Sequence, residues 1–325
     1  MTAEPVLRVE DLHVDFHTRR GLVRAVQGVS FSIEPGKTVC IVGESGSGKS
    51  TMSLALVGLL PGNAHTSGRV RLEGDDILGK PETQLEDVRG RRVGVIFQDA
   101  ARALNPVLTI GRQIAEVLQR HLNLSAEAAL ERAGELLTEV GVNDPAARIK
   151  QYPHQLSGGL KQRVMIAIAI ACEPALVIAD EPTTALDVSV QGQVLRLLRR
   201  LCTERRLALL LVTHDFGVVA AVADDVAVMY AGRIVEYADA VRLFAAPGHP
   251  YTRALLAATP RIALNAEGER AKIVPIPGTP PDPLAQPDGC SFAPRCVERF
   301  ERCAERPPLR GNAAGDRAAC WFVGA

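Results

Sequence analysis

A run of glycine, serine and lysine near the start of the chain most constrains what it can fold into. Residues 43–50 spell Gly-Glu-Ser-Gly-Ser-Gly-Lys-Ser, which has the form G-x-x-x-x-G-K-S/T. An apolar run, 39–42, leads into it, and apolar residues at helical spacing follow it over 50–56. Because glycine has no Cβ, this backbone can turn tightly and bring several N–H groups onto one phosphate. The stretch therefore predicts a phosphate-binding loop between a strand and a helix.

Two side chains of this loop have expected roles. We expect Lys49 to reach the β- and γ-phosphates of a nucleotide and the Ser50 hydroxyl to bind Mg²⁺. The alternative is a glycine-rich turn before a helix, but the strand and helix that the motif requires are both present. The predicted nucleotide contacts of this stretch are Gly43, Glu44, Ser45, Gly46, Ser47, Gly48, Lys49, Ser50 and Thr51.

The composition excludes several classes of protein. The 325 residues include 37 Lys plus Arg and 37 Asp plus Glu, so the net charge is zero. That balance argues against a nucleic-acid protein that relies on a basic field. No apolar run approaches the length of a membrane span, and the N-terminus has no signal pattern. We therefore expect a cytoplasmic protein, in a compartment where stable disulfides are rare.

Polar side chains stand at the ends of three further apolar runs. Gln98 closes one, Asp180 and Glu181 follow the second, and His214 follows the third. Parallel strands beside a phosphate-binding loop end at the nucleotide, so we expect these side chains to surround it. Two adjacent carboxylates at the end of a buried strand are costly unless they serve a cation or a reaction.

Each of these residues suits a part of phosphoryl transfer. Asp180 would join the Mg²⁺ shell, and Gln98 would contact Mg²⁺ or the attacking water. Glu181 suits a base that orients this water, and His214 suits a sensor of the γ-phosphate. The plainer alternatives are a polar strand terminus for Gln98 and a structural polar group for His214. With Lys49, these form the predicted catalytic set.

An antiparallel sheet is predicted ahead of the loop. Apolar residues alternate with polar ones over 12–16 and again over 29–33, which indicates two strands joined by a polar loop at 17–24. Phe16 ends the first strand. It either stacks on an adenine ring or packs in the core, and the sequence alone leaves both open.

A helical region interrupts the α/β pattern. Two helices are predicted within 105–150, and one face of the second is apolar. We therefore expect a helical subdomain, about 99–174, inserted into the α/β core. The residues of that apolar face are Leu130, Ala133, Leu136, Leu137 and Val140.

A second loop with glycines ends this region. Ser157, Gly158 and Gly159 open a predicted helix over 160–172, where backbone N–H groups and the helix dipole suit an anion. The alternative is an ordinary Ser-Gly helix cap. The phosphate-binding loop elsewhere in the chain favours the anion site.

In order and spacing, these motifs resemble the ATP-binding subunits of ABC transporters over roughly residues 7–245. The resemblance implies a P-loop α/β ATPase core with an antiparallel β subdomain and an inserted helical subdomain, which uses ATP and Mg²⁺. It implies that two such chains dimerise head to tail, each ATP lying between one P-loop and the partner's Ser157–Gly159 loop. The motifs are the P-loop, Gln98, Leu156-Ser157-Gly158-Gly159, Asp180-Glu181, Asp187 and His214.

The same resemblance assigns three further contacts. Phe16 occupies the position of the aromatic that stacks on adenine. Asp187 would lie at the dimer interface, and the cleft around Gln98 would receive a coupling helix from a membrane subunit.

The remainder of the chain narrows the family. Residues 244–256 look like the segment typical of oligopeptide, dipeptide and nickel importer ATPases, so we divide the chain into 1–245 and a C-terminal extension, 246–325. This implies a second, related ATPase subunit, two transmembrane permease subunits and an extracytoplasmic solute-binding protein as partners. It also implies a peripheral location at the cytoplasmic face of the plasma membrane. A proline-rich run, 275–287, should lack regular structure.

Four of the seven cysteines crowd into the extension. Cys290, Cys296, Cys303 and Cys320 are separated by five, six and sixteen residues. Four thiolates suit zinc or an iron–sulfur cluster, although the short Cys-x-x-Cys pairs of most zinc sites are absent. Importers of the resembled type hold a 4Fe–4S cluster here, so we favour that cluster, with Zn²⁺ as the alternative.

The sequence thus predicts an ATPase that powers an importer of di- or oligopeptides. A nickel or glutathione importer would share every motif described above. A DNA-repair or chromosome-organising ATPase would carry a long insertion between Gln98 and Ser157, and only 58 residues lie there. A ribosome-associated ATPase of this superfamily usually carries two motif sets in one chain, and this chain has one.

Overall fold

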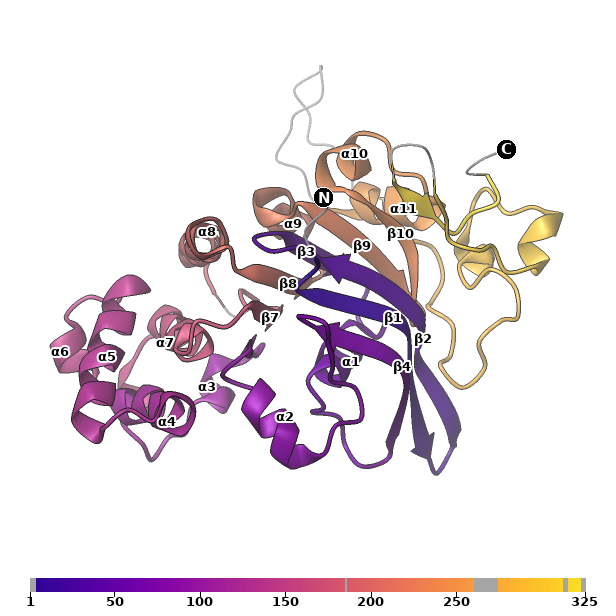
Figure 1. The fold of residues 1–325 in the computed structure, drawn as a ribbon. Coiled ribbons are helices and arrows are strands. Elements are labelled where there is room, and N and C mark those ends of the chain that lie inside the picture. Colours follow the sequence, from indigo (N-terminus) through magenta and orange to yellow (C-terminus); the bar gives the residue numbers. More distant parts are fainter. Residues whose placement is uncertain (1–3, 185, 260–273, 312–314, 323–325) are drawn as a thin grey trace, which may run out of the picture.

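The computed structural model describes residues 4–184, 186–259, 274–311 and 315–322 (Figure 1). Within them, a large sheet forms the centre of the molecule. Five adjacent strands, at one side of the sheet, run parallel to one another, and the three strands at the other side pair antiparallel. In spatial order the strands are β11 (Arg310–Gly311), β12 (Arg317–Ala318), β10 (Arg233–Asp239), β9 (Asp225–Tyr230), β3 (Thr38–Val42), β8 (Ala208–Thr213), β7 (Leu176–Asp180) and β6 (Val93–Ile96).

A second, antiparallel sheet packs beside it, as predicted. Its strands in spatial order are β2 (Gly21–Ile33), β1 (Leu7–Thr18), β4 (Ala64–Leu72) and β5 (Asp75–Asp76). The predicted loop at 17–24 is shorter than expected, because the pairing of β1 with β2 continues to Thr18 opposite Gly21. The side chains there are exposed, and a ladder needs only backbone groups, so polar residues extend the hairpin.

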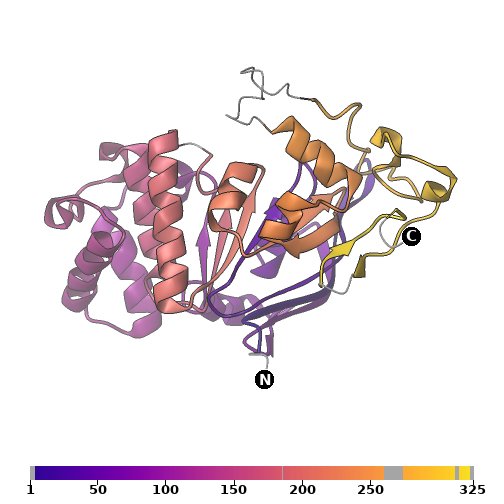
Figure 2. The ribbon, with the colours of Figure 1, turned by 90° about the horizontal axis from the view of Figure 1, so that it is seen from above.

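Alternation along the parallel strands builds two apolar layers. In β3, Val39 and Ile41 face the antiparallel sheet and α1 (Lys49–Leu56). Cys40 and Val42 face the opposite layer, where helices cover the sheet. This is the pattern of a parallel sheet buried on both sides (Figures 1 and 2). The covering helices are α7 (Gly158–Ile170), α8 (Val188–Arg205) and α9 (Phe216–Val222).

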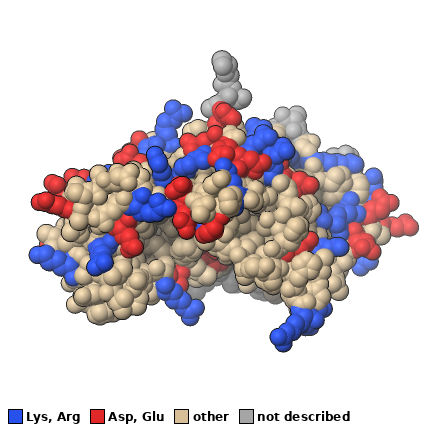
Figure 3. Space-filling view, turned by 60° about the horizontal axis from the view of Figure 1, so that its bottom comes forward, with Lys and Arg blue, Asp and Glu red and all other residues tan. Residues whose placement is uncertain are grey.

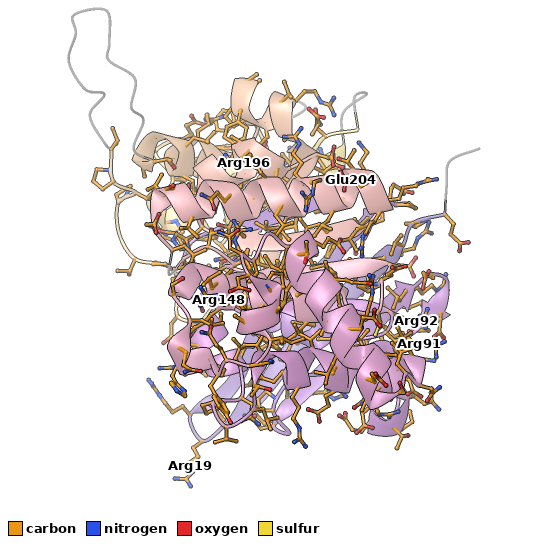
Figure 4. The ribbon with its side chains drawn as sticks, turned by 90° about the vertical axis from the view of Figure 1, so that its left-hand side faces the viewer. Arg19, Arg91, Arg92, Arg148, Arg196 and Glu204 are labelled. Carbon is orange, nitrogen blue, oxygen red and sulfur yellow. The ribbon has the colours of Figure 1, made fainter. Side chains whose placement is uncertain are left out.

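Between β6 and β7 the chain forms a helical lobe, seen at the left of Figure 1. Figure 4 faces this side and shows Arg148 on the lobe, with Arg196 and Glu204 on α8 beside it. The predicted apolar face of its second long helix is buried except for Leu130, which is 45% exposed. The lobe consists of α3 (Ala100–Ala103), α4 (Ile110–Leu122), α5 (Ala126–Glu139), α6 (Pro145–Arg148), η1 (Pro153–Gln155) and α7; α2 (Glu82–Val88) precedes β6.

The C-terminal extension returns to the core instead of hanging free. Tyr251 and Phe292 pack on Tyr230 of β9, with ring centroids 4.5 and 5.4 Å away. Strand β12 then pairs with β10 of the central sheet. Residues 274–292 contain no helix or strand, as the prolines predict. The extension and the segment before it contain α10 (Ala240–Ala245), α11 (Pro250–Ala258), η2 (Ala293–Arg295), η3 (Glu301–Ala304), β11 and β12.

Two surface properties bear on function. In the described part of the chain, every helix is too short or too polar to cross a membrane. Figure 3 shows one face on which basic and acidic side chains are intermixed. That face offers no broad basic field of the kind that nucleic-acid binding uses.

Candidate functional site

The P-loop turns where only glycine fits. Gly43 and Gly48 have φ of 157° and 100°. A Cβ on Gly43 would lie 2.1 Å from the carbonyl oxygen of Met229, and one on Gly48 would lie 2.3 Å from that of Ala25. Both distances are far inside contact range, so the neighbouring strands leave room for backbone alone. The loop can therefore wrap closely around a phosphate.

Lys49 is the first residue of α1 and lies buried under the loop. Its Nζ donates to the carbonyl oxygens of Gly43 and Glu44, each at 2.8 Å. Burial lowers the pKa of Lys49, while the negative charges of Glu181, Asp180 and Glu44 oppose that change. The amine thus stands among acidic groups within a loop built to hold a phosphate.

Ser50, the second residue of α1, is hydrogen-bonded to Asp180 at the end of β7. The Ser50 Oγ donates to Oδ1 of Asp180 over 3.1 Å. Burial raises the pKa of Asp180, with a further contribution from Glu181, although the bond from Ser50 opposes the rise. Mg²⁺ in nucleotide sites takes one or two protein oxygens and completes its shell with phosphate and water. Ser50 and Asp180 fit that requirement.

Three side chains converge on the carboxylate of Glu181. Its Oε2 accepts from Gln98 Nε2 at 2.9 Å and from Thr184 Oγ1 at 3.0 Å, and its Oε1 lies 2.9 Å from His214 Nδ1. Burial favours its neutral form, but the bonds from His214 and Thr184 outweigh burial and lower its pKa. Its φ of 45° is unusual for a non-glycine residue and marks a strained position at the strand end.

Except for Asp180, which lies outside the lining, these groups line one cavity of about 770 Å³. Its walls include the whole P-loop with Gln98, Glu181, Thr184 and His214. Residues 23–25 of β2 and the proline-rich part of the extension contribute further lining. Phe16 lies outside the lining and packs, half-buried, against the core of the antiparallel sheet. Its cross-strand partner Val23 lines the cavity instead.

The chain matches two family models. The ABC transporter model covers residues 26–184, and the model of the oligopeptide/dipeptide transporter C-terminal region covers 235–303. The dipeptide transport ATP-binding protein DppD of Bacillus subtilis (strain 168) is 48% identical over 322 residues, which is 98% of this chain and 95% of that protein. This chain belongs to the ABC transporter ATP-binding family.

Other relatives agree. The oligopeptide transport ATP-binding protein OppD of Escherichia coli (strain K12) is 47% identical over 319 residues, covering 98% of this chain and 94% of that protein. Among solved structures, the dimeric structure of MJ0796, a bacterial ABC transporter cassette, matches with a TM-score of 0.65 at 27% identity. The match covers 72% of this chain and 98% of the MJ0796 chain. The predicted fold class is thus confirmed, and the chain is an ATPase of the ABC type that uses ATP and Mg²⁺.

The second glycine loop of this ABC ATPase lies apart from the cavity. Ser157 caps α7 by accepting from the Leu160 N–H at 3.4 Å, and Ser157 and Gly158 are exposed. Asp187 caps α8 in the same way, through the Val190 N–H at 3.0 Å. Neither the Ser157–Gly159 loop nor Asp187 lines the cavity that holds the P-loop. Within one chain, these groups therefore act as helix caps.

The cysteine prediction gains no support. The four C-terminal cysteines are free, and Cys303 and Cys320 are close enough for their charges to raise the pKa of Cys290, after burial. Yet, among the residues described, no three His, Cys, Asp or Glu side chains are placed to hold a metal ion. The observed side-chain geometry therefore supports neither the 4Fe–4S cluster nor its zinc alternative. Spacing along a chain brings thiols into one region without fixing where each sulfur points.

Thr184 is a site residue that the sequence motifs did not predict. Its N–H donates to the Glu181 carbonyl over 3.3 Å, so the turn after the strand carries its hydroxyl back to the carboxylate. A hydroxyl residue three positions after a strand-end carboxylate is a recognisable signal for such a contact. It would have added Thr184 to the predicted set.

Proposed function

We propose that this chain is the ATP-hydrolysing subunit of an importer of di- or oligopeptides. The match of residues 235–303 to the oligopeptide/dipeptide transporter C-terminal region supports the peptide assignment, as do the relatives named for dipeptide and oligopeptide transport. The convergence of Gln98, Thr184 and His214 on the Glu181 carboxylate, at the edge of the P-loop cavity, supports the hydrolytic part.

The proposed roles follow from position. Lys49 and the P-loop N–H groups bind the β- and γ-phosphates and take up charge as it develops. Ser50 and Asp180, with Gln98 nearby, would hold Mg²⁺, which neutralises charge on the phosphates. Glu181 orients the attacking water and accepts its proton, and His214 contacts the γ-phosphate and the same water. Gln98 keeps the Glu181 carboxylate aimed at this water.

A second chain is needed to complete the site. The Ser157–Gly159 loop is exposed and offers a helix N-terminus and backbone N–H groups away from its own P-loop. We propose that it closes over ATP held by the P-loop of a partner ATPase in a head-to-tail dimer, with Asp187 at the interface. A related, non-identical subunit is the proposed partner. Because Val23 lines the P-loop cavity and Phe16 does not, Val23 is the proposed contact to adenine.

The transport role requires membrane partners. We propose two permease subunits, with the cleft near Gln98 receiving their coupling helices, and an extracytoplasmic solute-binding protein that selects the cargo. The chain would then lie peripherally on the cytoplasmic face of the membrane. ATP binding would close the dimer and switch the permease, and hydrolysis would reset it.

The C-terminal cysteines remain a separate prediction within this function. If Cys290, Cys296, Cys303 and Cys320 hold an iron–sulfur cluster, anaerobically purified protein should contain iron and absorb near ~400 nm. Protein that carries zinc instead, or neither metal, would remove the cluster. No step of ATP hydrolysis proposed above depends on it.

Co-purification from native membranes tests the transport assignment. The tagged chain should bring two multi-span proteins, a second P-loop chain and a solute-binding protein, and the ligand of that binding protein identifies the cargo. A binding protein that takes nickel or glutathione would change the cargo while leaving the ATPase in place. Recovery of ribosomal or nucleic-acid proteins, with no membrane subunit, would overturn the transport role.

A further inference from the structure

Arg295 of the C-terminal extension binds Glu44 of the P-loop. The carboxylate of Glu44, the second residue of the loop, accepts two hydrogen bonds from Arg295. Nη1 donates to Oε2 at 2.6 Å and Nη2 to Oε1 at 2.9 Å. This is the bidentate fork in which an arginine binds a carboxylate most firmly. The two residues are 251 positions apart, so the extension reaches back to the start of the nucleotide site.

Arg295 is built into this position. Its side chain is 4% exposed, and its Nε donates to the Pro277 carbonyl at 2.8 Å. Among the ion pairs of the described residues, Glu44 is its acidic partner. The bond to Glu44 is also the largest cause of its raised pKa. These bonds fix the orientation of the buried Arg295 guanidinium, and its positive charge is paired with the carboxylate of Glu44.

A second bond from the extension fixes the backbone of the same residue. The Glu44 N–H donates to the hydroxyl oxygen of Tyr251, 2.9 Å away, and the Tyr251 ring is fully buried. The Glu44 carbonyl accepts from Lys49, the residue proposed to bind the phosphates. Glu44 is thus fixed at its side chain and N–H by the extension, and joined at its carbonyl to Lys49.

The negative charge of Glu44 explains why its contacts with Arg295 and Tyr251 matter for ATP binding. Glu44 lines the cavity in which the phosphates of ATP would bind, so its carboxylate would repel them if it stood alone. A guanidinium at hydrogen-bond distance cancels that charge without entering the cavity, since Arg295 is not part of the lining. Buried ion pairs are weak evidence for stability as such, which points to a role in the site.

We propose that Arg295 is a positioning residue for ATP: by neutralising Glu44 and fixing the loop, it makes ATP affinity depend on the C-terminal extension. The extension also supplies a wall of the cavity through Pro280, Pro281, Pro283 and Gln286. Gln286 is bound to Gln27 of β2 at 2.6 Å, which ties that wall to the core. The inference rests on the proposed role of the P-loop in binding ATP.

Titration calorimetry of the full chain with ATP tests it. Arg295→Gln leaves the Glu44 charge facing the phosphates, so we expect the Kd for ATP to rise about tenfold or more. Glu44→Gln removes the repulsion itself, although it leaves the buried Arg295 charge unpaired, and should raise Kd less than Arg295→Gln does. The double variant Glu44→Gln/Arg295→Gln leaves neither charge and should return to within about threefold of the parent chain. A merely structural role would give no such rescue.

Controls separate this inference from the proposed function. Arg299→Gln changes an exposed arginine of the same extension and should leave Kd unchanged. Lys49→Ala should abolish ATP binding; if it does not, the ATP role of the loop fails. If Lys49→Ala loses ATP while Arg295→Gln binds it as the parent does, the positioning role alone is overturned.

A folding defect would not remove the test. Should Arg295→Gln fail to fold, Arg295→Lys keeps the charge but loses the two-pronged geometry, and we expect a Kd several-fold above that of the parent. A parent-like Kd in that variant would show that neutralising Glu44 accounts for the whole effect. A double variant Glu44→Gln/Arg295→Gln that folds, as judged by circular dichroism, but binds ATP about tenfold or more weakly than the parent chain would overturn the inference.

Discussion

The charges of two glutamates, Glu44 and Glu181, affect Lys49, and the two carboxylates have different hydrogen-bond partners. Both oppose the lowered pKa of that lysine, but Glu44 is paired with a full positive charge on Arg295. Glu181 is held by the amide of Gln98, the hydroxyl of Thr184 and the ring of His214. A carboxylate bound through both oxygens to a buried guanidinium is fixed in place, whereas one bound by an amide, a hydroxyl and an imidazole can still accept a proton. Identical side chains thus gain separate functions from their partners.

The largest effect should come from exchanging these two carboxylates for amides. We expect Glu181→Gln to keep ATP binding but slow turnover by roughly 10²–10⁴-fold, the usual size of a general-base effect. Glu44→Gln should leave kcat within about threefold of the parent, because its charge takes no part in the proton transfer. Steady-state kcat of both variants, with ATP affinity as the control, makes the comparison. Equal losses of kcat would show that the two glutamates do not differ in function.

Removing His214 should have the next largest effect. We expect His214→Ala to lower kcat by roughly 10²-fold, as the loss of one donor to a developing negative charge does. The His214 ring also orients Glu181, so part of this loss acts through the carboxylate. His154→Ala removes an exposed histidine of the helical lobe and serves as the matched control. If kcat is unchanged in His214→Ala, Glu181 needs no histidine partner.

The residues around Glu181 were largely predictable, and those around Glu44 were not. A motif fixes the P-loop, and parallel strands place Gln98, Asp180–Glu181 and His214 at its edge, so spacing and topology together predict the set. The partner of Glu44 lies 251 residues away, and local sequence carries no rule for a distant ion pair.

Other misses have similar causes. Leu130 was predicted on the apolar face of its helix but is 45% exposed, because it lies at the flank of the apolar stripe. Ala129, nearer the centre of that stripe, is buried instead. Phe16 could be placed on its strand, yet which residue of the hairpin lines the P-loop cavity depends on how the two sheets pack. The cysteine spacing likewise left the direction of each thiol undetermined.

A smaller change at Glu181 concerns pH. Thr184→Val removes one hydrogen bond that stabilises the ionised carboxylate, so the pKa of Glu181, now lowered, should rise. A base with a higher pKa is protonated at higher pH, and the acid limb of the kcat/KM profile should therefore move upward. We expect a loss of about fivefold on that limb, equivalent to about 1 kcal/mol for one hydrogen bond. Thr203→Val, an exposed position on α8, should leave the profile in place.

The smallest effect should appear in the C-terminal extension that contacts Glu44, as a loss of stability in mild acid. His249 caps α11 through the Tyr251 N–H at 3.0 Å, is buried, and has its pKa lowered by burial from 6.5 to about 3. Between these values the unfolded chain binds a proton that the folded chain does not, so the free energy of unfolding rises with pH. From pH 6.5 down to pH 5, where most carboxylates remain ionised, we expect it to fall by at most about 1.4 kcal/mol per pH unit.

Urea unfolding at several pH values measures this slope, and His249→Asn is the matched variant because asparagine keeps a helix cap but does not titrate. The variant should be less stable overall yet lose the part of the slope due to His249. His154→Asn, at an exposed position, should keep the slope. An unchanged slope in His249→Asn would mean that the histidine protonates without unfolding the extension. The contacts of Arg295 and Tyr251 with Glu44 would then be independent of pH in this range. The two glutamates would differ in their partners alone, and not in the stability of the segments that supply those partners.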